Sequence, residues 1–161
     1  MKSKTLSRRE AAVGGVAVLA AATASASDVS VKRINPKELP PSRGYTQVVT
    51  ASGGRTVYIS GQVAMNAKGE IVGKGDLKAQ AVQVFENLKI ALAASGAGPK
   101  DVVKMSIFVV NFKGADDVAV VRDVRNGFFA NVDPPASTFL GISALANPDW
   151  MLEIEAIAVV A

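Results

Sequence analysis

The chain has 161 residues, of which 49% are hydrophobic and 20% charged, with a formal net charge of +4 and neither cysteine nor histidine. This length suits one globular domain with a short appendage. The missing residue types exclude a histidine general base, a cysteine nucleophile, a Ser-His-Asp triad, a disulfide and a zinc site built on His or Cys. Any catalysis must therefore use carboxylates, Tyr, Lys, Arg, hydroxyls, backbone groups or water.

The N-terminal segment has the pattern of an export signal. Basic residues precede an Ala, Gly and Val run that is too short and too weakly hydrophobic to span a bilayer, and Ala24-Ser25-Ala26 forms a small-x-small cleavage signal. The Arg8-Arg9 pair is typical of the bacterial route for folded cargo, with an ordinary secretory signal as the alternative. We expect residues 1–26 to be cleaved near Ala26. The single domain 27–161 should then be periplasmic or secreted, without membrane contact.

The basic character of the chain lies mostly in this segment. Cleavage after Ala26 removes four of the eighteen Lys and Arg residues and one of the fourteen Asp and Glu residues, leaving fourteen basic against thirteen acidic side chains, a net charge of +1. A nearly neutral domain lacks the positive surface of a nucleic-acid binder. We therefore expect no nucleic-acid partner and no ribonuclease activity.

The rest of the sequence predicts the element order βββαβαββ. Asp76 should cap the first helix, whose apolar residues recur at helical spacing until Gly96 ends it. Ser52-Gly53-Gly54 is a hairpin signal between the second and third strands. Strands are expected at 29–34, 47–51, 56–62, 102–110, 136–142 and 150–160, and helices after Asp76 and at about 116–129. Two helices on one face of a mixed sheet make an α+β architecture, whose other face is wet or covered by another subunit.

Two carboxylates, Glu153 and Glu155, stand two residues apart in the last predicted strand, where the other side chains are apolar. Alternate residues of a strand share one face, so both lie on the same side of the sheet. A partly buried carboxylate there can transfer a proton near neutral pH. The alternative is that they mark the wet side of an antiparallel sheet.

Four stretches of the sequence resemble the signature of one family. They are Gly44-Tyr45-Thr46-Gln47, Ser60-Gly61-Gln62, Pro135-Ala136-Ser137-Thr138 and Glu153-Ile154-Glu155-Ala156-Ile157-Ala158. In order and spacing they are similar to the Rid family, also called the YjgF family, of imine and enamine deaminases. The resemblance implies a chorismate-mutase-like fold assembled as a homotrimer, with a small-molecule ligand in clefts between subunits. We expect no cofactor and no metal.

The resemblance also implies roles for individual residues. Glu153 matches the acid that helps to position the hydrolytic water, and Tyr45 matches the aromatic hydroxyl of the cleft, so both are catalytic candidates. Ser60 and Gly61 match a substrate-binding pair at a strand end. Without the motif, each of these residues also has a purely structural interpretation.

One departure from the family pattern concerns the substrate's carboxylate. The family's deaminases carry an Arg directly after Pro-Ala, where this chain has Ser137, and the Cys that often follows is Phe139 here. A charge-assisted contact of that kind contributes about 1.5–3 kcal/mol, roughly 10- to 150-fold in binding. The chain thus resembles Arg-less branches of the family, and Ser137 predicts weak turnover of ordinary 2-imino acids.

Two arginines of the second predicted helix are candidates to replace the missing one. Arg122 stands where the family often has a site-lining Asn, at the rim of the helix's apolar face, and Arg125 falls inside that face. Such an Arg commonly extends to solvent along an apolar surface. The alternative is that Arg122 or Arg125 binds an anionic substrate from another wall of the cleft.

Two functions therefore remain open at the level of sequence. The first is a Rid-type hydrolase acting on a small imine, enamine or related compound, because water can attack a protonated C=N bond with little more than orientation and a proton acceptor. The second is a ligand-binding or chaperone-like trimer that has lost its carboxylate anchor. Ser137 is the residue that divides them.

The export prediction can be checked by replacing both Arg8 and Arg9 with Lys. This change should block transport of folded cargo through a twin-arginine route while sparing a general secretory route. Fractionation of bacterial cells expressing the two forms measures the result. Unchanged export of the Lys form would show that the twin-arginine interpretation is wrong.

Overall fold

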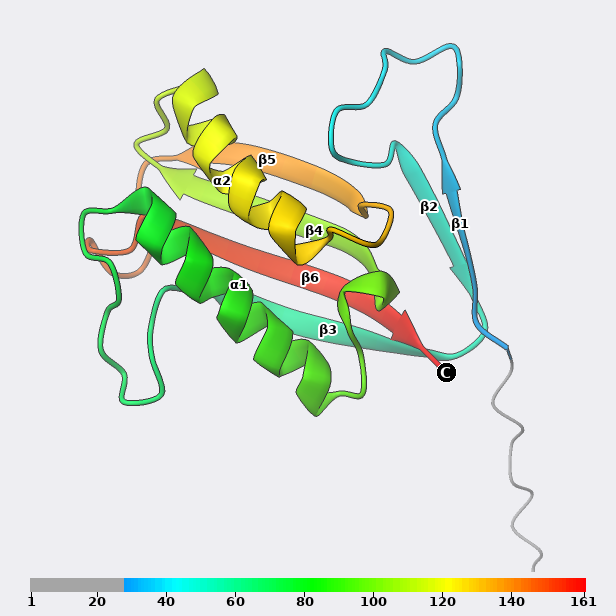
Figure 1. The fold of residues 1–161 in the computed structure, drawn as a ribbon, viewed down its shortest axis with the longest axis horizontal. Coiled ribbons are helices and arrows are strands. Elements are labelled where there is room, and N and C mark those ends of the chain that lie inside the picture. Colours follow the sequence, from blue (N-terminus) through cyan, green and yellow to red (C-terminus); the bar gives the residue numbers. More distant parts are fainter. Residues whose placement is uncertain (1–27) are drawn as a thin grey trace, which may run out of the picture.

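The computed structural model describes residues 28–161 and has the predicted element order. The predicted signal peptide and its cleavage site lie outside the described residues. The elements are β1 (Ser30–Ile34), β2 (Val48–Ser52), β3 (Arg55–Gln62), α1 (Leu77–Ala94), a 3-10 turn (Pro99–Asp101), β4 (Val102–Val110), α2 (Ala115–Phe128), β5 (Ala136–Ile142) and β6 (Leu152–Val160). The four strands β3-β6-β4-β5 form a mixed sheet, in which β4 and β5 are parallel. Both helices lie across one face of it (Figure 1), so the α+β prediction is confirmed.

Helix α1 begins where Asp76 caps it. The Asp76 carboxylate accepts hydrogen bonds from the backbone N–H groups of Lys78 and Ala79 at 2.9 and 3.0 Å, which satisfies two of the donors that a helix start leaves free. The predicted apolar stripe faces the sheet, and its buried members are Ala81, Val84, Phe85, Leu88 and Leu92. The helix ends before Gly96, whose φ of +77° suits the glycine that closes a helix.

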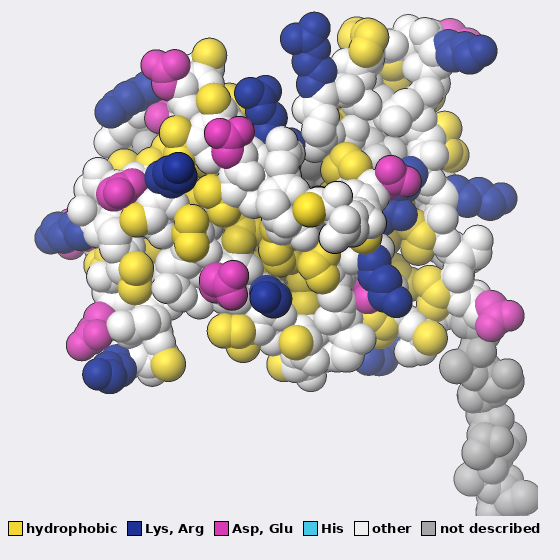
Figure 2. Space-filling view, in the orientation of Figure 1, with side chains coloured by type: hydrophobic (Ala, Val, Ile, Leu, Met, Phe, Trp, Pro, Cys, Tyr) yellow, Lys and Arg dark blue, Asp and Glu magenta, His cyan; other side chains and the backbone are white. Residues whose placement is uncertain are grey.

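The sheet has one covered and one open face. In β6, Leu152, Ile154 and Ala156 are buried under the helices, while Glu153 is half-buried and Glu155 exposed on the other side. Alternation along the strand produces this division. In Figure 2 apolar side chains show between the helices, which lie over the hydrophobic core. No helix within residues 28–161 is long and apolar enough to cross a membrane.

The predicted hairpin between the second and third strands is wrong. β2 pairs antiparallel with β1 in a separate two-stranded sheet, and β3 pairs with β6. Gly53 and Gly54 have φ of +73° and +67°, so the chain changes direction there without pairing the strands. The loop before β2 is instead bound to the start of β5, because Thr46 donates to the carbonyls of Pro135 (backbone N–H, 3.0 Å) and Pro134 (hydroxyl, 2.6 Å).

The last strand begins later than the sequence predicts. β6 starts at Leu152, and Trp150 lies in the preceding turn, where its backbone N–H donates to the carbonyl of Asn147 at 3.1 Å. The other predicted boundaries differ by one residue or agree, as is usual for fraying ends.

A buried glutamine joins α1 to that turn. The Gln80 side chain is fully buried; its Nε2 donates to the carbonyl of Asp149, and its Oε1 accepts from the N–H of Met151, both at 2.8 Å. A buried amide with both ends paired is stabilising, and removing it leaves backbone groups without partners.

Replacing Gln80 with Leu should lower the free energy of unfolding by about 1–3 kcal/mol for each of the two backbone groups left unpaired. Gln83→Leu is the matched control on the same helix. It removes one side-chain hydrogen bond to Asn87 and leaves no backbone group without a partner. Urea unfolding at equal protein concentration measures both. Equal midpoints for the two variants would contradict the role assigned to Gln80.

Candidate functional site

A cavity of about 450 Å³ lies between α2, the strands β4 and β5, and the loop before β2. It brings together four of the seven predicted site residues, namely Tyr45, Arg122, Arg125 and Ser137. Its walls otherwise consist of Arg43 and the apolar residues Ile107, Phe112, Val118, Val121 and Phe139. Cationic groups above an apolar floor suit a small anionic molecule with an apolar part.

Helix α2 carries two of the arginines to this cavity at the i, i+3 spacing that aligns side chains on one helix face. Arg125 is only 8% exposed, whereas Arg122 is exposed at the rim. Burial lowers the pKa of Arg125 below its usual value, and the charge of Arg122 lowers it further. An arginine nevertheless remains a cation at neutral pH, so the cavity contains a desolvated positive charge.

The loop before β2 closes over that buried arginine. Gly44 has φ of +80°, and a Cβ at this position would overlap the guanidinium of Arg125. Because Thr46 is bound to Pro134 and Pro135, its neighbour Tyr45 is held beside the start of β5, where Ser137 lies. The first of the four family-like stretches, Gly44-Tyr45-Thr46-Gln47, thus has a packing role as well as a place in the cavity.

Arg43 belongs to the cavity and was not singled out from the sequence. It is exposed and comes from the same loop. Its position directly before Gly44-Tyr45, the first family-like stretch, is the sequence feature that could have predicted its place in the cavity. Within the described part of the chain, no Asp or Glu forms an ion pair with Arg43, Arg122 or Arg125; the ion pair found there joins Lys74 to Asp149.

The other three predicted site residues, Ser60, Gly61 and Glu153, lie elsewhere. The Glu153 carboxylate lies against Gly61, where a Cβ would overlap it. Ser137 is level with Met105 and Ala156 across the sheet, whereas Glu153 is level with Phe108. Glu153 is therefore two strands across and three residues along from Ser137, about 10 Å in each direction, and on the opposite face. One chain alone does not bring Glu153 to the cavity.

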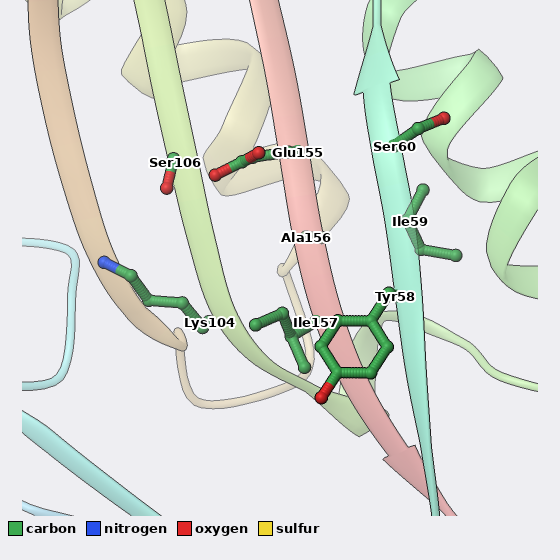
Figure 3. A pocket seen from close by; sticks show the side chains of 8 residues that line it. All are labelled: Tyr58, Ile59, Ser60, Lys104, Ser106, Glu155, Ala156 and Ile157. Carbon is green, nitrogen blue, oxygen red and sulfur yellow. The ribbon is translucent and has the colours of Figure 1, made fainter.

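The open face of the sheet has a shallow hollow that includes Ser60 (Figure 3). Glu155 points toward Ser106 across the hollow, and Lys104 extends toward β5, where its Nζ donates to the Thr138 hydroxyl at 2.6 Å. Tyr58, at the edge of the hollow, is 78% exposed. Apolar and charged side chains are thus interspersed on this face. Across residues 28–161 no three His, Cys, Asp or Glu side chains lie close enough to hold a metal ion.

Comparison with known proteins identifies the family. A family model described as Endoribonuclease L-PSP matches residues 35–160. A protein of Dermatophagoides farinae named 2-iminobutanoate/2-iminopropanoate deaminase is 38% identical over 134 residues, which are 82% of this chain and 99% of that protein. The chain belongs to the Rid (YjgF) family.

Solved structures of Rid proteins confirm the fold. YyfB of Yersinia pestis, a Rid-family protein of unknown function, is 43% identical, covers 81% of this chain and 98% of its own, and has a TM-score of 0.76. YyfA, a second Rid protein of unknown function from the same organism, is 30% identical and also covers 81% of this chain, with all of its own length aligned, but its TM-score is 0.60. The same share of the chain thus superposes less closely on the second structure.

Proposed function

We propose that this Rid protein hydrolyses a small anionic imine or enamine, releasing ammonia, with the anionic group bound by Arg125. The observation that carries the proposal is the buried Arg125 guanidinium in a cavity shared with Ser137 and Tyr45, with no acidic partner in residues 28–161. The deaminase name of the 38% identical relative supports the reaction type.

Arg125 takes over the role that the family assigns to the residue after Pro-Ala. Ser137 offers one neutral hydrogen bond at that position, and Arg125 lines the same cavity from the helix side. A guanidinium binds a carboxylate with two parallel hydrogen bonds, and burial strengthens the attraction because water screens it less. In this proposal the chain belongs to an Arg-less branch that has kept an anion-binding function, and its turnover of 2-imino acids exceeds what Ser137 alone predicts.

The chemistry needs a water molecule and a proton acceptor. The oxygen of water adds to the carbon of the protonated C=N bond as the acceptor takes a proton from the water. The acceptor then passes that proton to the nitrogen of the carbinolamine, which leaves as ammonia as the acceptor takes the proton of the hydroxyl, and a C=O bond remains. Tyr45 lines the cavity and is placed to hold the water or the substrate nitrogen through its hydroxyl.

The acceptor in this proposal is Glu153 of a second copy. Because Glu153 lies on the opposite face of its own sheet, it reaches a cavity only across a contact between subunits. The open face provides that contact: its exposed apolar side chains include Tyr58 and Leu140, 78% and 44% exposed. We infer a homotrimer with the site between subunits, as the family resemblance implies.

A non-catalytic ligand-binding trimer is the second candidate. It is favoured by the cavity of the single chain, whose lining includes no carboxylate. The two functions differ in one readout, since a binding protein takes up a 2-imino acid or its stable keto analogue without releasing ammonia.

Replacing Arg125 with Met removes the charge and keeps an apolar stem in the buried space. We expect KM for short 2-imino acids, generated in the assay from the amino acids, to rise roughly 10- to 150-fold through the loss of about 1.5–3 kcal/mol. Ammonia release measures turnover. Arg122→Met is the matched control at an exposed position and should have a smaller effect.

Adding Ser137→Arg to the Arg125→Met variant should recover most of the lost affinity, because the new arginine at position 137 brings a guanidinium back into the same cavity. A folded Arg125→Met protein with unchanged KM would refute the anchor. Absence of ammonia release by the unaltered protein, with the keto analogue still bound, would favour the binding function instead.

The trimer is tested by placing a second cation on the open face. Ile157 is level with Lys104 on the neighbouring strand, so Ile157→Lys creates a like-charge pair there. Light scattering should show three copies for the unaltered protein and fewer for this variant, with ammonia release falling in parallel. Ile90→Lys, at a 66% exposed position of α1, should change neither. A monomeric unaltered protein at micromolar concentration would contradict the intersubunit site.

A further inference from the structure

Residues 30–52, which comprise β1, the following loop and β2, form an arm that is separate from the main sheet. Its two strands pair with each other from Ser30–Ser52 to Ile34–Val48. Figure 1 shows the arm beside the main sheet, joined to it at the corner where β3 begins, and Figure 2 shows it as a distinct lobe. The arm is thus a unit that can pair as a whole.

Two strand edges remain without a strand partner in the described part of the chain. One is the edge of β2 that faces away from β1, and the other is the edge of β3 that faces away from β6. Each presents a row of backbone N–H and C=O groups, which is a template for pairing with another strand. The arm also has exposed apolar side chains, with Ile34 and Val48 each 42% exposed.

The joint between β2 and β3 consists of two glycines. Positive φ at Gly53 and Gly54 is also what a two-residue hairpin turn requires, so the sequence is compatible with β2 beside β3. In this structure the joint is open. Gly54 is pressed against the C-terminal end of β6, where a Cβ would overlap the carbonyl of Val160 and the side chain of Val29. The Gly53-Gly54 joint therefore permits β2 to pair with a β3 strand, but it does not require that strand to belong to the same chain.

The arm is held away from its own β3 by contacts with the segments that precede β5 and β4. Thr46 binds the carbonyls of Pro134 and Pro135 before β5, and the Arg33 guanidinium donates to the carbonyls of Lys100 and Val102 at 3.2 and 3.4 Å. These bonds fix the loop and β1. Thr46 also forms an isolated parallel bridge with Ala136, whereas β2 itself (Val48–Ser52) pairs only with β1 in the described part of the chain.

We propose that the outer edge of β2 pairs with the β3 edge of a second copy of this chain. The second copy is the fitting partner because its β3 carries the sequence that the glycine joint is suited to place beside β2. In a homotrimer each copy gives its arm to one neighbour and receives an arm from the other, so the contacts close into a ring instead of a fibre. The two Rid structures from Yersinia pestis align over the same share of this chain. Their TM-scores against it nevertheless differ, 0.76 for one and 0.60 for the other.

The absence of cysteine makes a direct test possible. If β2 and β3 pair in the register of a two-residue joint, Ser52 faces Arg55 and Val49 faces Tyr58. Chains with Val49→Cys and chains with Tyr58→Cys, one of them carrying a mass tag, are co-expressed, purified and oxidised. We expect a tagged–untagged disulfide at twice the chain mass on a non-reducing gel. Ile90→Cys in place of Val49→Cys is the control for random collision, because Ile90 is 66% exposed on α1.

A chain that carries both Val49→Cys and Tyr58→Cys distinguishes the alternatives. A monomer-sized product without free thiols would show that the arm folds back onto its own β3, and the proposal would be overturned. Absence of the mixed disulfide, or a yield equal to the Ile90→Cys control, in protein with an unchanged circular dichroism spectrum would overturn it as well. The ring of arms rests on the homotrimer of the proposed function, but the readout is covalent and independent of ammonia release, so failure of the arm pairing and failure of the proposed function are distinguishable.

Discussion

Two helices over one face of a four-stranded sheet are the constraint on which the rest of this structure depends. Strand alternation sends each side chain to the covered or the open face, and both faces carry residues of the family signature. Ser137 goes to the helix side and Glu153 to the open side. The cavity that holds Arg125, the proposed anion-binding group, and Glu153, the proposed proton acceptor, therefore lie on opposite sides of the sheet, and the proposed contact between copies would bring them together.

Packing holds Arg125 in the cavity from the side of helix α2. Its neighbours on the face of α2, including the fully buried Val121, hold the helix against the sheet, and Gly44 leaves room for the guanidinium. The charge is thus fixed by packing in the cavity that Ser137 also lines. In the proposed function, Arg125 on the helix wall of the cavity offsets the absence of an arginine at Ser137 on the strand wall.

The sequence was most informative where local signals and tertiary contacts agree. The Asp76 cap with its apolar stripe and the β-branched run of β4 appear in the structure as predicted. The predicted hairpin between β2 and β3 was wrong because Gly53 and Gly54 permit a tight turn but do not require the two strands to pair. The distant bonds from Thr46 to Pro134 and Pro135 decide where β2 lies, and no local pattern encodes them.

The same reason limits prediction of the cavity. Helical periodicity placed Arg125 within an apolar face, but only the structure shows which wall that face meets, and it adds Arg43 from a loop without periodicity. Ser60, Gly61 and Glu153 were predicted together with Tyr45 because a sequence motif does not show which residues one chain brings together. A single chain separates them again.

Salt should weaken the attraction of the exposed arginines for an anion more than that of the buried Arg125. At physiological ionic strength mobile ions screen exposed charges over about 8 Å, so the pull of Arg43 and Arg122 on an approaching anion weakens as salt rises. Arg125 is shielded from those ions by the protein around it. The association rate of an anion should therefore depend on salt concentration far more than its dissociation rate from the cavity.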